Sequence, residues 1–208
     1  MAAKEIWTTI AAERRALADD VKGLSDTQWG TPSLCTDWSV RDVVAHMTAT
    51  AEMTPPSFFA KLTGSGFSFT KMSNKEIAKR VTGTPASTLA RFESRVASKK
   101  HPPGPTLSWL GETIVHSEDV RRPLRISHDY PADALKQVAD FYRKSNLIVG
   151  GKNRVAGLTL RATDTDWTAG SGPEVAGPMI DLVLAIVGRT SALEKLSGPG
   201  VETLRSRS

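Results

Sequence analysis

Hydrophobic positions repeat at helical spacing through the first 150 residues of the sequence. The clearest stripe follows Ser39, and its apolar members lie three or four positions apart: Val40, Val43, Val44, Met47 and Ala51. That spacing is typical of the buried face of an α-helix. Ser39 is a favourable N-cap residue, and Asp42 three positions later comes close to the capping-box pattern. The pattern therefore predicts a helix that begins at Val40.

Further helices are expected from the same kind of spacing and from start and stop signals. The long ones cover residues 4–22, 84–100, about 106–121, and a segment from Pro131 to Gly150. A short helix is expected to open at Ser73. Residues 25–36 are expected to form a long connection. Residues 57–72, which follow Pro55-Pro56 and are rich in Gly, Ser and Phe, predict a loop or a frayed helix end.

The pattern changes after residue 150. Residues 157–161 and 166–169 are typical of short strands joined by a polar turn, and residues 178–196 carry a helical pattern. The sequence therefore predicts a mainly α protein. A helical bundle is expected in residues 1–150 and a small α+β region in residues 151–208.

Composition narrows the class of protein. Cys35 is the single cysteine, so an internal disulfide is excluded. No apolar run approaches the roughly 20 residues that cross a bilayer, and the charged N-terminus is unlike a secretory signal. We therefore expect a cytoplasmic protein that does not bind a membrane. The net charge is +5, but basic and acidic residues alternate, so nucleic-acid binding is not expected.

The candidate chemistry lies in two of the predicted helices. His46 lies at the flank of the apolar stripe that follows Ser39, where a residue can face a cleft between helices. Glu112 and His116 are four positions apart, so they project side by side, and Asp119 extends the same polar stripe. Two imidazoles and a carboxylate form a known catalytic zinc ligand set. A Glu-x-x-x-His pair also occurs as an ordinary surface contact, and this pattern alone leaves both readings open.

Three segments of the chain resemble one known family. The segment WSVRDVVAH, residues 38–46, closely resembles the second-helix signature of DinB-like metal-binding bundles. Within that superfamily it is most similar to the mycothiol-dependent maleylpyruvate isomerase branch found in actinobacteria. Residues 111–123 resemble the second metal motif of that branch, and residues 192–200 are similar to its usual C-terminal segment.

The resemblance implies a fold, a metal site and a cofactor. It implies an up-and-down four-helix bundle in which His46, Glu112 and His116 bind a divalent metal ion, zinc foremost with nickel as the other candidate. It also implies mycothiol as a low-molecular-weight thiol cofactor, used for isomerisation or S-transfer on a small electrophilic substrate. A free thiol has a pKa near 8.5, and coordination to a divalent cation deprotonates it.

The resemblance further implies that an arginine of the C-terminal region holds the substrate, and Arg161 and Arg189 are the candidates. Asp119 is a candidate to orient His116 through the ring nitrogen that does not bind the metal. Alternatively, it pairs with Arg122. No side chain is assigned to catalysis itself, and Cys35 is interpreted as a small buried hydrophobe.

Two other functions stay open, as does the choice between monomer and homodimer. One is a metal-dependent hydrolase that needs no thiol. The other is a non-catalytic metal-binding module.

Overall fold

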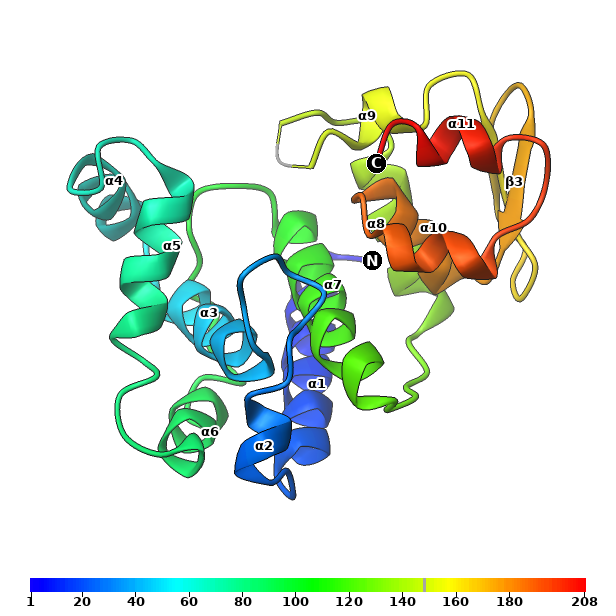
Figure 1. Ribbon diagram of the computed structural model, residues 1–208. Helices are drawn as coiled ribbons and strands as arrows, with labels where there is room; N and C mark the ends of the chain where they lie inside the picture. The colour runs from blue at the N-terminus through cyan, green and yellow to red at the C-terminus, as the bar shows by residue number, and fades with distance from the viewer. Residues whose placement is uncertain (148) are drawn as a thin grey trace. The chain divides into compact units, whose positions relative to one another are not determined.

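The computed structural model describes residues 1–147 and 149–208, in two compact units. The first unit comprises Ala2–His128, and the second comprises Asp129–Ser208 together with Met1. Figure 1 shows the helices of each unit. Among the described residues, none of the helices has the length and apolar character needed to span a membrane.

The first unit is built on a four-helix bundle, as the sequence predicts. Its helices are α1 (Ala3–Val21), α3 (Val40–Glu52), α6 (Pro85–Glu93) and α7 (Thr106–Leu124). α1 and α3 each pack against both α6 and α7, so the four helices enclose one core. Helix α3 begins at Val40, and both halves of the capping box between Ser39 and Asp42 are present. The predicted bundle and the predicted start of this helix are confirmed.

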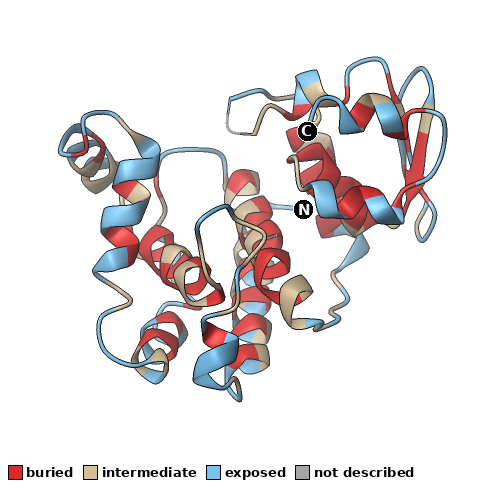
Figure 2. Cartoon of the chain, in the orientation of Figure 1, coloured by how far each residue is buried: buried red, intermediate tan, exposed pale blue. Residues whose placement is uncertain are grey.

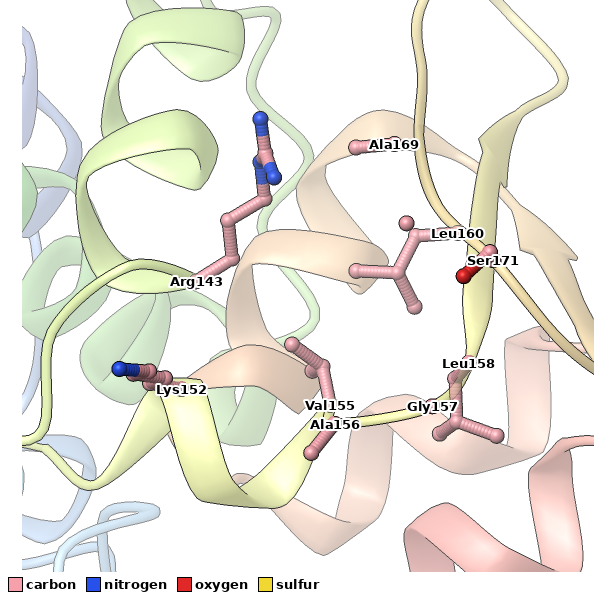
Figure 3. A pocket seen from close by; sticks show the side chains of 10 residues that line it. Arg143, Lys152, Val155, Ala156, Gly157, Leu158, Leu160, Ala169 and Ser171 are labelled. Atoms are coloured by element: carbon pink, nitrogen blue, oxygen red, sulfur yellow. The ribbon is translucent and has the colours of Figure 1, made fainter.

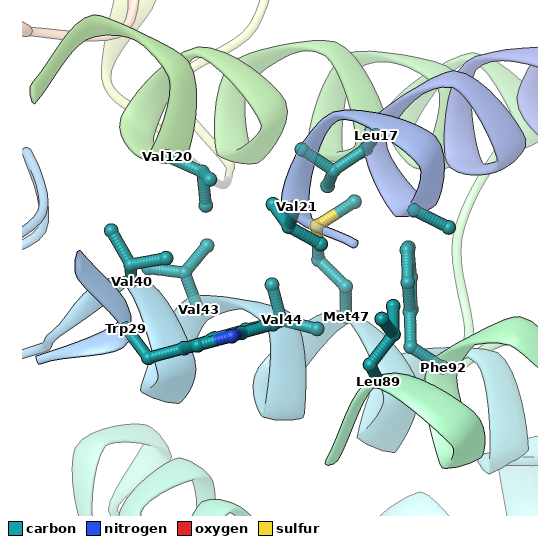
Figure 4. Close-up of a cluster of buried hydrophobic side chains, with 11 residues drawn as sticks. Leu17, Val21, Trp29, Val40, Val43, Val44, Met47, Leu89, Phe92 and Val120 are labelled. Atoms are coloured by element: carbon teal, nitrogen blue, oxygen red, sulfur yellow. The ribbon is translucent and has the colours of Figure 1, made fainter. Parts of the chain in front are cut away.

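The core of the bundle is formed by the stripe that the sequence shows. Figure 4 shows side chains from the four helices converging on one cluster. Helix α3 contributes four residues that are fully buried: Val40, Val43, Val44 and Met47. Leu17, Val21, Phe92 and Val120 meet them from the other three helices. Burial of these apolar surfaces is the main term that stabilises the unit.

Two shorter helices lie in segments expected to be irregular: α2 (Asp26–Trp29) interrupts the expected connection, and α4 (Pro55–Thr63) replaces the first part of the expected loop. Helix α5 (Phe69–Ala78) contains the short helix expected from Ser73, but it begins four residues earlier. The loop prediction was wrong because Pro55 starts a helix instead of ending one. Proline is tolerated at the first helical position, where its missing N–H has no intrahelical partner to lose. The Thr54 side chain caps that helix by accepting a hydrogen bond from the backbone N–H of Ser57.

Helix ends also differ from the sequence-based expectation. Helix α6 ends at Glu93, seven residues before the expected end at residue 100. Helix α7 continues through Pro123 to Leu124, where Arg125 closes it in a left-handed conformation with a φ of 58°. A proline in the last turn removes one helical hydrogen bond without ending the helix.

The second unit combines helices with a small sheet, so the predicted α+β character is confirmed. The sheet has the strand order β2–β1–β3, with β1 antiparallel to β2 and parallel to β3. Its strands are β1 (Thr159–Ala162), β2 (Thr168–Gly170) and β3 (Glu174–Gly177). Its helices are α8 (Ala132–Tyr142), α9 (Gly151–Arg154), α10 (Met179–Ile186), the 3-10 helix η1 (Thr190–Lys195) and α11 (Val201–Arg205).

The division between the units falls earlier than residue 150, where the sequence placed it. Helix α8 packs against α10 of the second unit. An apolar helical stripe identifies a buried face but does not say which partner covers it. The sequence therefore assigned α8 to the bundle, although its partner lies about 40 residues later in the chain.

Candidate metal centre

His46, Glu112 and His116 come together between α3 and α7. One ligand atom of each residue lies within 4.8 Å of those of the other two. The ring centroids of His46 and His116 are 4.9 Å apart, with the planes inclined at 77°. Because the two helices pack side by side, the flank of the α3 stripe faces the polar stripe of α7. The three side chains are half-buried, as residues that line a cleft would be.

The carboxylate of Glu112 has one oxygen satisfied and one unsatisfied. Thr50 Oγ1 donates a hydrogen bond to Glu112 Oε1 at 2.7 Å. Glu112 Oε2 is buried and has no hydrogen-bond partner among the described residues. A buried oxygen without a partner is costly, and such groups in native proteins usually have a reason. A divalent cation held by two imidazoles and this oxygen would satisfy it, so the residues present fit a metal ion.

The ring of His116 is engaged on its Nδ1 side. Nδ1 lies 2.9 Å from Oδ2 of the fully buried Asp119, and 3.7 Å from Sγ of Cys35. Burial disfavours the charged imidazole, but the hydrogen bonds to Asp119 and Cys35 outweigh it and raise the pKa of His116 to about 10. Asp119 therefore lies where a group that orients His116 should lie, while Arg122 is bonded to Glu118 at 2.9 Å.

The pKa of His46 is shifted in the opposite direction to that of His116. Burial and the neighbouring charge of His116 lower the pKa of His46 to about 3, against the opposing effect of Asp119. A neutral imidazole keeps a nitrogen lone pair free for a cation. The indole of Trp38 lies over this ring at a centroid distance of 4.9 Å, and Trp38 Nε1 donates to Asn74 Oδ1 of α5 at 3.1 Å.

Cys35 was interpreted from the sequence as a small buried hydrophobe, but it is half-buried and lies beside the candidate centre with polar neighbours. Pro123 has no N–H, so the Asp119 carbonyl four residues earlier lacks its helical donor. That carbonyl accepts the backbone N–H of Leu34 at 3.2 Å instead, which ties the connection before α3 to α7. Cys35 Sγ consequently donates to Asp119 Oδ2 at 3.0 Å. The position of Pro123 one turn beyond Asp119 was the signal available in the sequence.

Cys35, His116 and Asp119 also form a second group of potential metal ligands, within the same 4.8 Å limit. His116 belongs to both groups. It meets Cys35 and Asp119 through Nδ1, which leaves Nε2 as the ring nitrogen available to a cation shared with other residues.

The two arginines proposed for substrate binding lie in the second unit. Arg161 on β1 donates twice to Glu174 on β3, at 2.8 and 3.0 Å. Arg189 follows α10, and its charge adds to burial in lowering the pKa of Arg154. Neither arginine lines the cavity of about 250 Å³ shown in Figure 3. That cavity combines the cationic side chains Arg143 and Lys152 with an apolar lining.

Comparison with known proteins identifies relatives of this arrangement. Residues 10–101 match the family model described as the mycothiol maleylpyruvate isomerase N-terminal domain. The matched segment contains His46 and ends before Glu112. A search of curated proteins finds no match.

Two solved structures are similar over nearly the whole chain. Both are crystal structures of the mycothiol-dependent maleylpyruvate isomerase, one of them a histidine-to-alanine mutant. The mutant has a TM-score of 0.67 and the other structure 0.64. Each is 16% identical to this chain and covers 96% of it, with 93% of that chain covered in return. At this identity the likeness shows the fold, including that of the C-terminal region.

Proposed function

We propose that this chain, whose residues 10–101 match the mycothiol maleylpyruvate isomerase N-terminal domain family, is a divalent-metal-dependent enzyme. In this proposal it uses mycothiol as a thiol cofactor for isomerisation or S-transfer on a small electrophilic substrate. The observation that supports it most directly is the convergence of His46, Glu112 and His116 around the unsatisfied Glu112 Oε2.

His46, Glu112 and His116 are the proposed ligands, with zinc as the preferred ion and nickel as the alternative. Three protein ligands leave a coordination position for a small molecule, which is typical of catalytic and not of structural sites. A divalent cation bound there supplies Lewis acidity, which lowers the pKa of a coordinating thiol well below its ordinary value near 8.5.

Neighbouring side chains orient the three proposed ligands or set their protonation. Asp119 accepts from Nδ1 of His116 and so directs Nε2 toward the metal position. Because the pKa of His116 is raised in the metal-free protein, a bound cation would have to displace the proton from Nε2. Thr50 holds one oxygen of Glu112 and thereby fixes the rotation of the carboxylate. Burial keeps His46 neutral, and the Trp38 ring shields one of its faces from water.

The proposal also names residues that bind the substrate. Arg161 and Arg189 are proposed to hold an anionic group of the substrate. To do so, Arg161 would have to give up its hydrogen bonds to Glu174.

The cellular compartment is also part of the proposal. A protein with one cysteine needs no oxidising compartment, so we propose that it acts in the cytoplasm, where thiols remain reduced.

The test is turnover by the metal-loaded protein with and without mycothiol. Candidate substrates are maleylpyruvate and a panel of activated alkenes, epoxides and alkyl halides, with thiol consumption and product formation as the readouts. The proposal expects mycothiol-dependent turnover that is lost in His116→Ala. Formation of hydrolysis products without any thiol would instead identify a metal-dependent hydrolase. Stoichiometric metal without turnover on any substrate would identify a non-catalytic metal-binding module.

A further inference from the structure

Four phenylalanines lie on α4, at the start of α5 and in the segment that joins these helices. We call Phe58, Phe59, Phe67 and Phe69 the aromatic patch. Phe59, Phe67 and Phe69 are 58%, 71% and 62% exposed. Phe58 is half-buried and packs against Phe59 and Phe69, with ring centroids 5.5 and 6.0 Å away. Scattered exposed apolar residues are ordinary, but aromatic rings in mutual contact, as Phe58, Phe59 and Phe69 are, mark a site of interaction.

The helix that carries half of the patch has little attachment to the rest of its unit. Leu62 is the single residue of α4 that is buried. Figure 2 shows that most residues of this helix are exposed or half-buried. An amphipathic helix normally turns its apolar side inward, whereas α4 turns Phe59 outward. Phe67, between the two helices, is held at a φ of 59°, a conformation that is rare for a bulky side chain.

The charges around the patch are almost entirely positive. Residues 53–80 contain five basic side chains and one acidic side chain, Glu76. Glu76 is buried and is bonded to three of the five: Lys61, Lys79 and Arg80. Lys71 and Lys75 remain exposed, and Lys75 Nζ donates to the Gly64 carbonyl at 2.9 Å. The surface that presents the aromatic rings is therefore cationic.

We propose that this surface docks the protein on an anionic lipid membrane. Aromatic side chains insert at the level of the lipid headgroups, and lysines beside them are attracted to anionic headgroups. A second copy of the chain fits this surface less well. A two-fold contact through the patch would bring two cationic surfaces together, and like charges oppose such a contact.

The docking surface is connected to the candidate metal centre. Helix α5 packs on α3, and Asn74 of α5 accepts the hydrogen bond from Trp38, whose ring lies over His46. Docking through α4 and α5 would therefore place α3 directly behind the helices that contact the membrane. The proposal does not depend on the chemistry at that centre.

Vesicle co-sedimentation tests the proposal directly. The full chain is incubated with vesicles of phosphatidylcholine alone and with vesicles that contain phosphatidylglycerol as well. We expect binding to the anionic vesicles only, with a loss of at least tenfold in 0.5 M salt because screening weakens the lysine contribution. The double variants F59S/F69S and K71Q/K75Q should each bind at least tenfold more weakly.

Matched controls separate this patch from general charge and hydrophobicity. K99Q/K100Q removes two exposed lysines outside the patch, and Leu147→Ser removes an apolar side chain that is 87% exposed. Both controls should bind like the native chain. Circular dichroism should show that all variants keep the native melting temperature, since the changed side chains are exposed.

Three results would overturn the proposal. The first is an absence of binding to anionic vesicles by the native chain. The second is equal binding by the native chain and by F59S/F69S. The third is a native dimer that F59S/F69S converts to monomer, because a second copy would then be what covers the patch.

Discussion

His116 Nδ1 and Asp119 Oδ2 lie 2.9 Å apart, one turn from each other on α7. Carboxylates in this position orient metal-binding histidines, and their removal typically costs 10–100-fold in metal affinity. We therefore expect Asp119→Asn to weaken zinc binding by about that factor. Isothermal titration of the metal-free protein measures this affinity.

The matched control is Asp133→Asn, which removes an exposed carboxylate from the first turn of α8. It should leave zinc affinity unchanged. An Asp119→Asn variant that binds zinc as tightly as the native chain would show that Asp119 does not orient His116.

The hydrogen bond from Thr50 to Glu112 predicts a smaller effect. Thr50→Val keeps the shape of the side chain but removes the hydroxyl that holds Glu112 Oε1. We expect zinc affinity to fall by about tenfold, at the lower end of the usual range. Thr50→Ser retains the hydroxyl and should bind zinc within about threefold of the native chain. Equal losses in the two variants would mean that packing, not the hydrogen bond, accounts for the effect.

The sequence predicted the bundle well because local signals specify it. The Ser39 capping box and the stripe that begins at Val40 establish where α3 starts and which face is buried. The same signals placed His46 at the edge of the core. The spacing of Glu112 and His116 placed them on one face of α7.

The parts that the sequence missed depend on contacts between distant segments. The approach of Cys35 to Asp119 follows from a carbonyl freed by Pro123 and taken by Leu34, about 90 residues earlier. Thr50 was overlooked because a threonine in a helix usually bonds to its own backbone. Helix α4 was missed because Pro55 starts helices as readily as it breaks them.

Glu76 gives the bundle a specific dependence on acid. Burial raises the pKa of this carboxylate, but hydrogen bonds from Lys61, Lys79 and Arg80 outweigh that effect and lower it to about 2. A lowered carboxyl pKa contributes stability that is fully present above the unfolded value of 4.5 and is lost as the pH falls through about 2. Urea denaturation across this range should show the free energy of unfolding falling with pH.

Glu76→Gln should remove this pH dependence. At pH 7 we expect the variant to be less stable by about 1–3 kcal/mol, the usual cost of losing a partner to charged hydrogen-bond donors. Below pH 2 its stability should approach that of the native chain, because native Glu76 is then protonated. A variant with the same pH slope as the native chain between pH 4.5 and 2 would assign the slope to other carboxylates.

Two phenylalanines with opposite exposure provide a test of the fold. Phe92 is fully buried in the core cluster, whereas Phe59 is 58% exposed. Phe92→Ala should lower the free energy of unfolding by about 3–5 kcal/mol through lost burial and the cavity left behind. Phe59→Ala should change it by about 0.5 kcal/mol or less. Similar losses for the two variants would contradict the packing described for α6.

The metal content of the purified protein tests the central claim most directly. Mass spectrometry is applied after reconstitution with zinc and removal of excess ion, to the native chain and to His46→Ala, Glu112→Gln and His116→Ala. Circular dichroism confirms that each variant is folded. The account predicts close to one ion per native chain and a large loss in each folded variant. No bound ion in the native chain, or unchanged content in all three variants, would contradict it.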